Sequence, residues 1–127
     1  MTKKSRESQD IPKKPTRLIF CCSGASNVGA LSYLASMRLS QEEFGNFSCI
    51  AGIAGNITPM VEGAKKAQER ILIDGCPTGC GRRIMEIARV PVDRYIVVTE
   101  LGIKKTHDYD VDDLDIETIV RKARHPG

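Results

Sequence analysis

Short apolar runs alternate with amphipathic segments along this chain. The apolar runs predict four strands, at residues 17–22, 47–53, 71–73 and 95–99. Apolar residues at helical spacing predict four helices, at residues 28–43, 58–68, 78–89 and 112–124. We therefore expect an α/β fold, a three-layer sandwich in which helices cover both faces of a mainly parallel sheet of about four strands.

In such a sheet, the loops that leave the carboxyl ends of the strands meet at one edge, where ligands bind. Cys22, the segment 74–80 and the segment 99–107 all follow predicted strands, so we expect them at this edge. Cys49 lies inside the second predicted strand and joins the others only if that strand ends early. The edge therefore gathers most of the thiols of the chain.

The segment 71–81 carries the strongest local signal for chemistry, because it ends a strand with two cysteines spaced Cys-x3-Cys. The pattern predicts Cys76 at the N-cap and Pro77 at the first helical position. Cys80 then follows one turn further along the same helix face. The helix dipole favours negative charge there and lowers the pKa of a thiol. Thiolate is the form that binds a metal or attacks an electrophile.

The composition fits one compact domain with a short basic leader. The chain has 127 residues, of which 41% are hydrophobic, and we expect one domain at residues 17–127. The formal charge of +3 comes from residues 1–16, whose basic, Pro-containing composition predicts a disordered leader. The domain itself is neutral, has no Trp and has few aromatic residues. Nucleic acid therefore ranks last among the partners considered.

The cysteines point to metal or redox chemistry. No segment predicts a signal peptide or a membrane span, so we expect a cytoplasmic protein without a membrane partner. In that reducing compartment, an odd count of five cysteines favours ligands or reactive thiols over disulfides.

The segment 22–29, Cys-Ser-Gly-Ala-Ser-Asn-Val-Gly, joins the first predicted strand to the first predicted helix. Its backbone N–H groups could hold an anion, as does the phosphate loop of low-molecular-weight tyrosine phosphatases. The arginine of that loop and the lysine of a nucleotide-binding P-loop are both absent from the segment. We favour a simpler role, in which Gly24 and Gly29 allow a tight turn and Ser26 or Asn27 caps the helix.

Four motifs occur in order at or after the predicted strands. They are Cys-Ser-Gly at 22–24, Cys-Ile-Ala-Gly-Ile at 49–53, Asp-Gly-Cys-Pro-Thr-Gly-Cys at 74–80 and Val-Thr-Glu-Leu-Gly-Ile-Lys-Lys at 98–105. Together they resemble the DGC-domain family, which is named for its Asp-Gly-Cys motif. The resemblance runs from about Leu18 to the last predicted helix and leaves out the basic leader.

The resemblance implies a small cytoplasmic protein that is proposed to bind zinc through four cysteines, with no settled biochemical role. Matched residue by residue, the ligands fall on Cys22, Cys49, Cys76 and Cys80. Zinc accepts tetrahedral thiolate coordination, and structural sites usually contain ligands separated by two to four residues. Cys76 and Cys80 meet that spacing.

Several assignments at this edge have two readings. Cys49 is either a ligand or a small buried residue, whereas we favour a core position for Cys21. His107 either completes a set of three cysteines and one histidine or is simply solvated. Asp74 either orients a ligand or caps a turn. The lysine pair at 104–105 either attracts an anionic substrate or forms an ordinary solvated surface.

Two functions from different classes therefore stand side by side. In the first, thiolates hold zinc, or alternatively an iron–sulfur cluster, at the sheet edge. In the second, the protein is a thiol-dependent redox or sulfur-transfer enzyme with Cys22 or Cys76 as the nucleophile. The sequence does not decide whether the protein is an enzyme, and it names no substrate, reaction or oligomeric state.

Overall fold

The computed structural model describes residues 16–127 and contains a four-stranded parallel sheet in the order β2-β1-β3-β4. All three pairs of neighbouring strands run parallel. The strands are β1 (Arg17–Cys21), β2 (Asn46–Phe47), β3 (Glu69–Asp74) and β4 (Arg94–Val97). The α/β fold class is thus confirmed. The predicted basic leader, apart from Thr16, lies outside the described residues.

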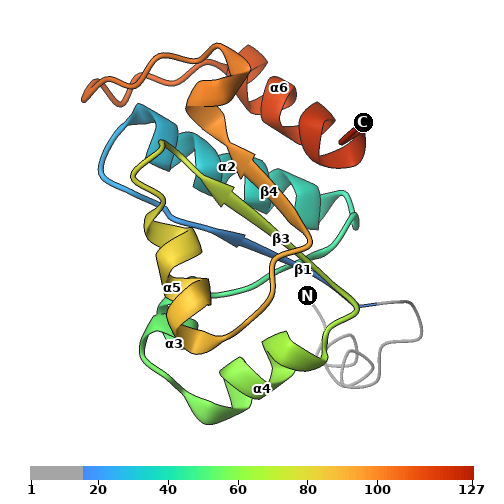
Figure 1. The fold of residues 1–127 in the computed structure, drawn as a ribbon. Helices are drawn as coiled ribbons and strands as arrows, with labels where there is room; N and C mark the ends of the chain where they lie inside the picture. The colour runs from blue at the N-terminus through green and yellow to red at the C-terminus, as the bar shows by residue number, and fades with distance from the viewer. Residues whose placement is uncertain (1–15) are drawn as a thin grey trace, which may run out of the picture.

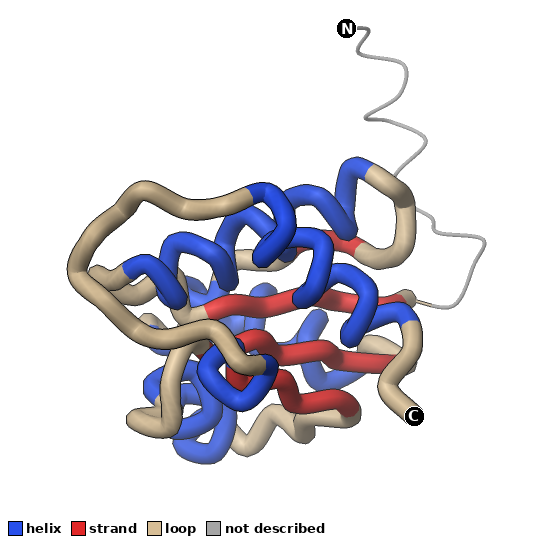
Figure 2. Tube along the Cα trace, turned by 90° about the horizontal axis from the view of Figure 1, so that it is seen from above, coloured by secondary structure: helices blue, strands red, loops and turns tan. Residues whose placement is uncertain are grey.

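Helices cover both faces of the sheet, as Figure 1 shows. They are α2 (Asn27–Gln41), α3 (Ile50–Ala54), α4 (Thr58–Lys66), α5 (Cys80–Ala88) and α6 (Asp113–Arg124), with a 3-10 turn, η1 (Val98–Leu101). Helices α2 and α6 lie on one face, and α3, α4 and α5 on the other; Figure 2 views the same arrangement from above. None of the described helices has both the length and the apolar composition of a membrane span.

The core is split by the sheet into two layers. Alternate residues of a strand point to opposite faces, so Ile19 and Ile71 pack with α2 and α6. Phe20 and Leu72 pack on the other side, against Val61 of α4 and its neighbours. All four of these strand side chains are at most 1% exposed. This two-sided burial explains why the central strands are almost continuously apolar.

The predicted second strand is largely wrong. Strand β2 has only two residues, and the chain continues into the short helix α3, which was not predicted. Cys49 is the N-cap residue of α3, and it is exposed. The reason is local packing: Gly52 lies against Met60, with no room for a Cβ, and Ile53 is buried beneath the helix.

The predicted start of the third helix is also wrong. Cys76 and Pro77 precede α5 in a turn, and the N-cap is Gly79, whose φ of 68° is left-handed and suits glycine. The turn is closed by a 3.2 Å hydrogen bond from Gly79 N to Cys76 O. Cys76 and Cys80 therefore do not share a helix face.

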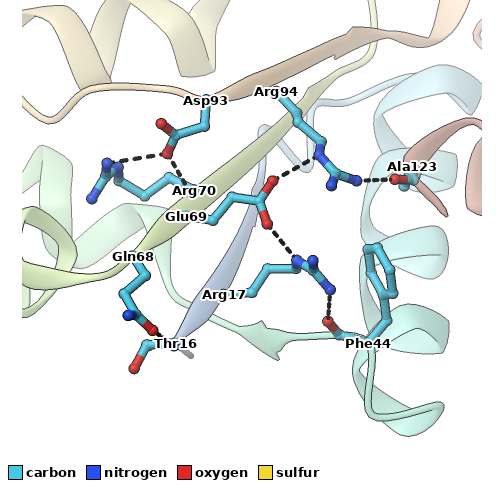
Figure 3. Close-up of polar contacts among 9 residues, drawn as sticks. All are labelled: Thr16, Arg17, Phe44, Gln68, Glu69, Arg70, Asp93, Arg94 and Ala123. Carbon is cyan, nitrogen blue, oxygen red and sulfur yellow. Dashed lines mark hydrogen bonds and ion pairs between the residues drawn. The ribbon is translucent and has the colours of Figure 1, made fainter. Parts of the chain in front are cut away.

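The amino edge of the sheet is fixed by an ion-pair network, shown in Figure 3. Glu69 of β3 accepts hydrogen bonds from Arg17 of β1 at 2.6 Å and from Arg94 of β4 at 2.7 Å. The two arginines continue to the carbonyl oxygens of Phe44 and Ala123. One carboxylate thus connects three strands at the end opposite the cysteines, which leaves the carboxyl edge to form a site.

Candidate functional site

A pocket of about 250 Å³ lies at the carboxyl edge of the sheet. The loop after β1, the loop after β3 and the segment after η1 all contribute to its wall. The pocket is lined by Cys22, Gly24, Ala25, Ser26, Val28, Gly29, Asp74, Gly75, Cys76, Thr78, Gly79, Cys80 and Lys105. The structure therefore brings three of the five cysteines to one pocket, at the edge that the parallel sheet predicts.

Cys22, rather than its neighbour Cys21, faces this pocket. Cys21 ends β1, is 2% exposed and packs in the core with α2 and α6. Burial raises the pKa of the Cys21 thiol. Cys22 continues beyond the strand, and its Sγ accepts a 3.3 Å hydrogen bond from the backbone N–H of Gly75. The sulfur of Cys22 thus bridges the loops that follow β1 and β3.

Cys76 is the cysteine with the clearest thiolate environment. Its Sγ lies 3.4 Å from Thr78 Oγ1 and 3.5 Å from the ammonium nitrogen of Lys105. Hydrogen bonding to the side chain and backbone of Thr78 lowers the pKa of Cys76, and Lys105 lowers it further. The residue is only half-buried, so a reagent in the pocket can reach its sulfur.

Asp74 caps the helix that begins with Cys80. Its buried carboxylate accepts hydrogen bonds from the backbone N–H groups of Gly81 at 2.9 Å and Arg82 at 3.0 Å. Tyr95 donates a third bond of 2.7 Å from its hydroxyl. Burial raises the pKa of Tyr95, and the neighbouring Asp74 carboxylate raises it further. Asp74 thus has a capping role, but it caps helix α5 and not a turn, and it leaves the exposed Cys80 at the first position of α5.

The loop after β1 is built for a close turn. A Cβ on Gly29 would lie 2.1 Å from the carbonyl oxygen of Gly24. Ser26 is the N-cap of α2, and its hydroxyl accepts a 3.1 Å hydrogen bond from Gly29 N. The N–H of Asn27 is also occupied, by Thr106 O at 3.0 Å. These bonds agree with the turn-making interpretation, since they occupy donors that an anion would need.

Cys49 and His107 are not in the pocket wall. Both are exposed, Cys49 before α3 and His107 in the segment between η1 and α6. Within residues 16–127, no three His, Cys, Asp or Glu side chains are grouped closely enough to hold one metal ion. This arrangement does not fit a closed site of four thiolates.

The contacts of Lys105, Thr78 and Tyr95 were missed by sequence reasoning. The lysine pair at 104–105 was a usable signal, because it suggested positive charge at this edge. Nothing in the sequence pairs Tyr95 with Asp74, since the two residues lie on adjacent strands and meet only through sheet register.

Comparisons with known proteins agree with the four motifs. Residues 18–123 match the family model of the DGC domain. The anaerobic and virulence modulator AnvM of Pseudomonas aeruginosa is 31% identical over 108 residues, which cover 85% of this chain and 82% of that protein. No solved structure matches significantly. The family match includes every residue of the pocket wall, and the chain belongs to the DGC-domain family.

Proposed function

We propose that this protein acts through a reactive thiolate at Cys76, in redox or sulfur-transfer chemistry. The observation that carries the proposal is the position of Cys76 Sγ, 3.5 Å from Lys105 Nζ, in a pocket that Cys22 and Cys80 also line. A neighbouring ammonium group favours the thiolate over the thiol. Two further thiols in the same wall supply the second cysteine that dithiol chemistry requires.

The reaction that suits this wall is thiol–disulfide exchange. The Cys76 thiolate attacks one sulfur of a disulfide substrate, the substrate S–S bond breaks, and the other sulfur leaves as a thiolate. Cys80 or Cys22 then attacks the mixed disulfide and releases the first sulfur. The substrate gains two electrons and becomes two thiols, while the two protein cysteines become a disulfide.

The name of the relative is compatible with this proposal. AnvM is described as an anaerobic and virulence modulator. A thiol pocket whose oxidation state changes with oxygen supply would suit a modulator of that kind.

The experiment is alkylation of the metal-free protein with iodoacetamide from pH 5 to 9, followed by mass spectrometry of each cysteine peptide. Cys76 should react fastest, and exposed Cys49 is the internal reference. The pH at which Cys76 reaches half of its maximal reactivity should lie below the ordinary thiol pKa of about 8.5. Lys105→Met should move the pH of half-maximal Cys76 reactivity to a higher value. Lys66→Met, the same charge change on α4, should leave that pH unchanged. Cys76 labelling no faster than that of Cys49 would contradict the proposal.

We also propose a second function, zinc binding, because cysteines from two separate loops line one pocket. Cys22, Cys76 and Cys80 could serve as three protein ligands, and a water or Cys49, which is not in the pocket wall, could complete the set of four. The loops would have to move to bring the sulfurs together, since no such group exists in residues 16–127.

Metal analysis of protein purified without chelator tests this second function. About one zinc per chain supports it, and metal-free folded protein overturns it. A Cys49→Ser variant that keeps its zinc favours the three pocket cysteines as ligands, and loss of zinc favours all four. Visible absorbance with bound iron would instead favour an iron–sulfur cluster.

A further inference from the structure

The segment between η1 and α6 is fixed to the start of α2 by one side chain. Asn27 Nδ2 donates a 2.8 Å hydrogen bond to Lys104 O, and Asn27 Oδ1 accepts a 2.6 Å bond from Thr106 N. The backbone N–H of Asn27 adds a 3.0 Å bond to Thr106 O. We call these three bonds the Asn27 clasp. Nearby Ile103 is buried in the core, so the segment is held at two points.

The clasp determines where Lys105 lies, because it holds the residues on both sides of it. The Lys105 ammonium reaches Cys76 Sγ at 3.5 Å and lines the pocket. An ammonium group has three N–H donors, so two remain for a ligand. In the described part of the chain, no carboxylate forms an ion pair with Lys105.

The other residue of the wall with an acidic or basic side chain is Asp74, and its oxygens are already occupied. They accept the two backbone N–H bonds and the Tyr95 hydroxyl bond described above. Asp74 is 1% exposed, so it offers little surface to a ligand. Apart from the Cys76 thiolate itself, Lys105 is therefore the charged group of the wall that a substrate can contact.

We propose that the Asn27 clasp fixes Lys105 as a specificity-determining cation, so that the pocket selects small thiol-reactive substrates that carry a negative charge. This inference rests on the proposed thiol chemistry of Cys76. A small organic disulfide that bears a carboxylate is the substrate class that fits. The size limit comes from the pocket volume of about 250 Å³ and from the small residues that line it. Asn27 acts through Lys105 and is a positioning residue.

The test compares two alkylating reagents of similar size, anionic iodoacetate and neutral iodoacetamide, at one pH on metal-free protein. Both reagents attack the same thiolate, so the ratio of their rates at Cys76 is independent of the fraction of thiolate present. The ratio is the rate with iodoacetate divided by the rate with iodoacetamide. We divide its value at Cys76 by its value at Cys49 in the same sample. This normalised ratio should be about 3 to 10 for the wild-type protein at low ionic strength, and added salt should reduce it.

The variants assign the effect to its residues. Lys105→Met and Asn27→Ala should each bring the normalised ratio down by about threefold or more. The normalised ratio of the double variant should be no lower than that of Lys105→Met, since Asn27 acts only through Lys105. Lys66→Met is the matched control for charge and should leave the ratio at the wild-type value. If circular dichroism shows that Asn27→Ala is unfolded, Thr106→Pro is the second variant. It removes the Thr106 N–H from the clasp and should also lower the normalised ratio.

Two results would overturn the inference. One is a wild-type ratio at Cys76 equal to that at Cys49, and the other is an unchanged ratio in folded Asn27→Ala when Lys105→Met lowers it. Failure of the proposed thiol chemistry can be distinguished from failure of this inference. It would appear in the iodoacetamide rate alone, as slow labelling of Cys76.

Discussion

The hydroxyl of Tyr95 donates a 2.7 Å hydrogen bond to Oδ2 of Asp74, and so connects β4 to the carboxylate that caps α5. Asp74 ends β3, and Tyr95 lies on the neighbouring strand. The start of α5, and with it the position of Cys80, therefore depends on a buried carboxylate that three donors from two elements hold in place.

Replacement of this carboxylate should destabilise the protein. Asp74→Asn turns one acceptor oxygen into an NH2 group that faces an N–H or hydroxyl donor, so we expect a loss of about 1–3 kcal/mol in the free energy of unfolding. Urea denaturation followed by circular dichroism measures it. The control is Asp110→Asn in the exposed segment before α6, which should change stability by less than about 0.5 kcal/mol. Equal effects of the two variants would contradict the capping role.

Tyr95 should make the stability of the protein sensitive to alkaline pH. Burial and Asp74 raise the pKa of Tyr95 in the folded state, so its ionisation favours the unfolded state. Its contribution is complete below the unfolded pKa of about 10 and is lost as the pH rises above it. In Tyr95→Phe the unfolding free energy should be about 0.5–1.5 kcal/mol lower at pH 8 and should decline less between pH 9 and 11. Exposed Tyr109→Phe should retain the wild-type profile.

Two glycines should respond in opposite directions to alanine. A Cβ at Gly29 would meet the backbone of Gly24, so Gly29→Ala should cost about 1–3 kcal/mol or more. A methyl group at Gly63, inside α4, would have no neighbouring heavy atom within 4 Å, so Gly63→Ala should add about 0.5–1 kcal/mol. Thermal melts of the two variants test the pair, and a stabilised Gly29→Ala would show that the turn can open at little cost.

Cys21 should be the slowest thiol of the folded protein. It is buried, and burial raises its pKa, so both access and thiolate formation oppose its reaction. Under native conditions its alkylation should be at least about tenfold slower than that of exposed Cys49. In guanidinium chloride all five cysteines should label at similar rates. Rapid native labelling of Cys21 would place it outside the core.

The main elements of the fold were predictable because a parallel strand between two helical layers needs a continuous apolar run. That rule identified β1, β3 and β4, each to within a few residues. It failed around Cys49, because the apolar residues at 50–53 have a spacing that a short helix can bury as well as a strand can.

The site was predictable only as a location. The sheet edge followed from topology, and the placement of Cys22, Cys76 and Cys80 in one pocket agrees with it. The contact between Lys105 and Cys76 was not predictable. The position of Lys105 depends on the hydrogen bond from the Asn27 side chain to the carbonyl oxygen of Lys104, and these two residues are 77 positions apart in the sequence. Such long-range bonds leave no periodic pattern in a single sequence.

The strand order β2-β1-β3-β4 also has a consequence for the rate of folding. The central pairing joins distant parts of the chain: Arg17 of β1 lies opposite Glu69 of β3, 52 residues later. No hairpin exists among the described strands to nucleate the sheet locally, since every pairing is parallel. Loop closure must precede sheet formation, so refolding should take milliseconds to seconds rather than microseconds.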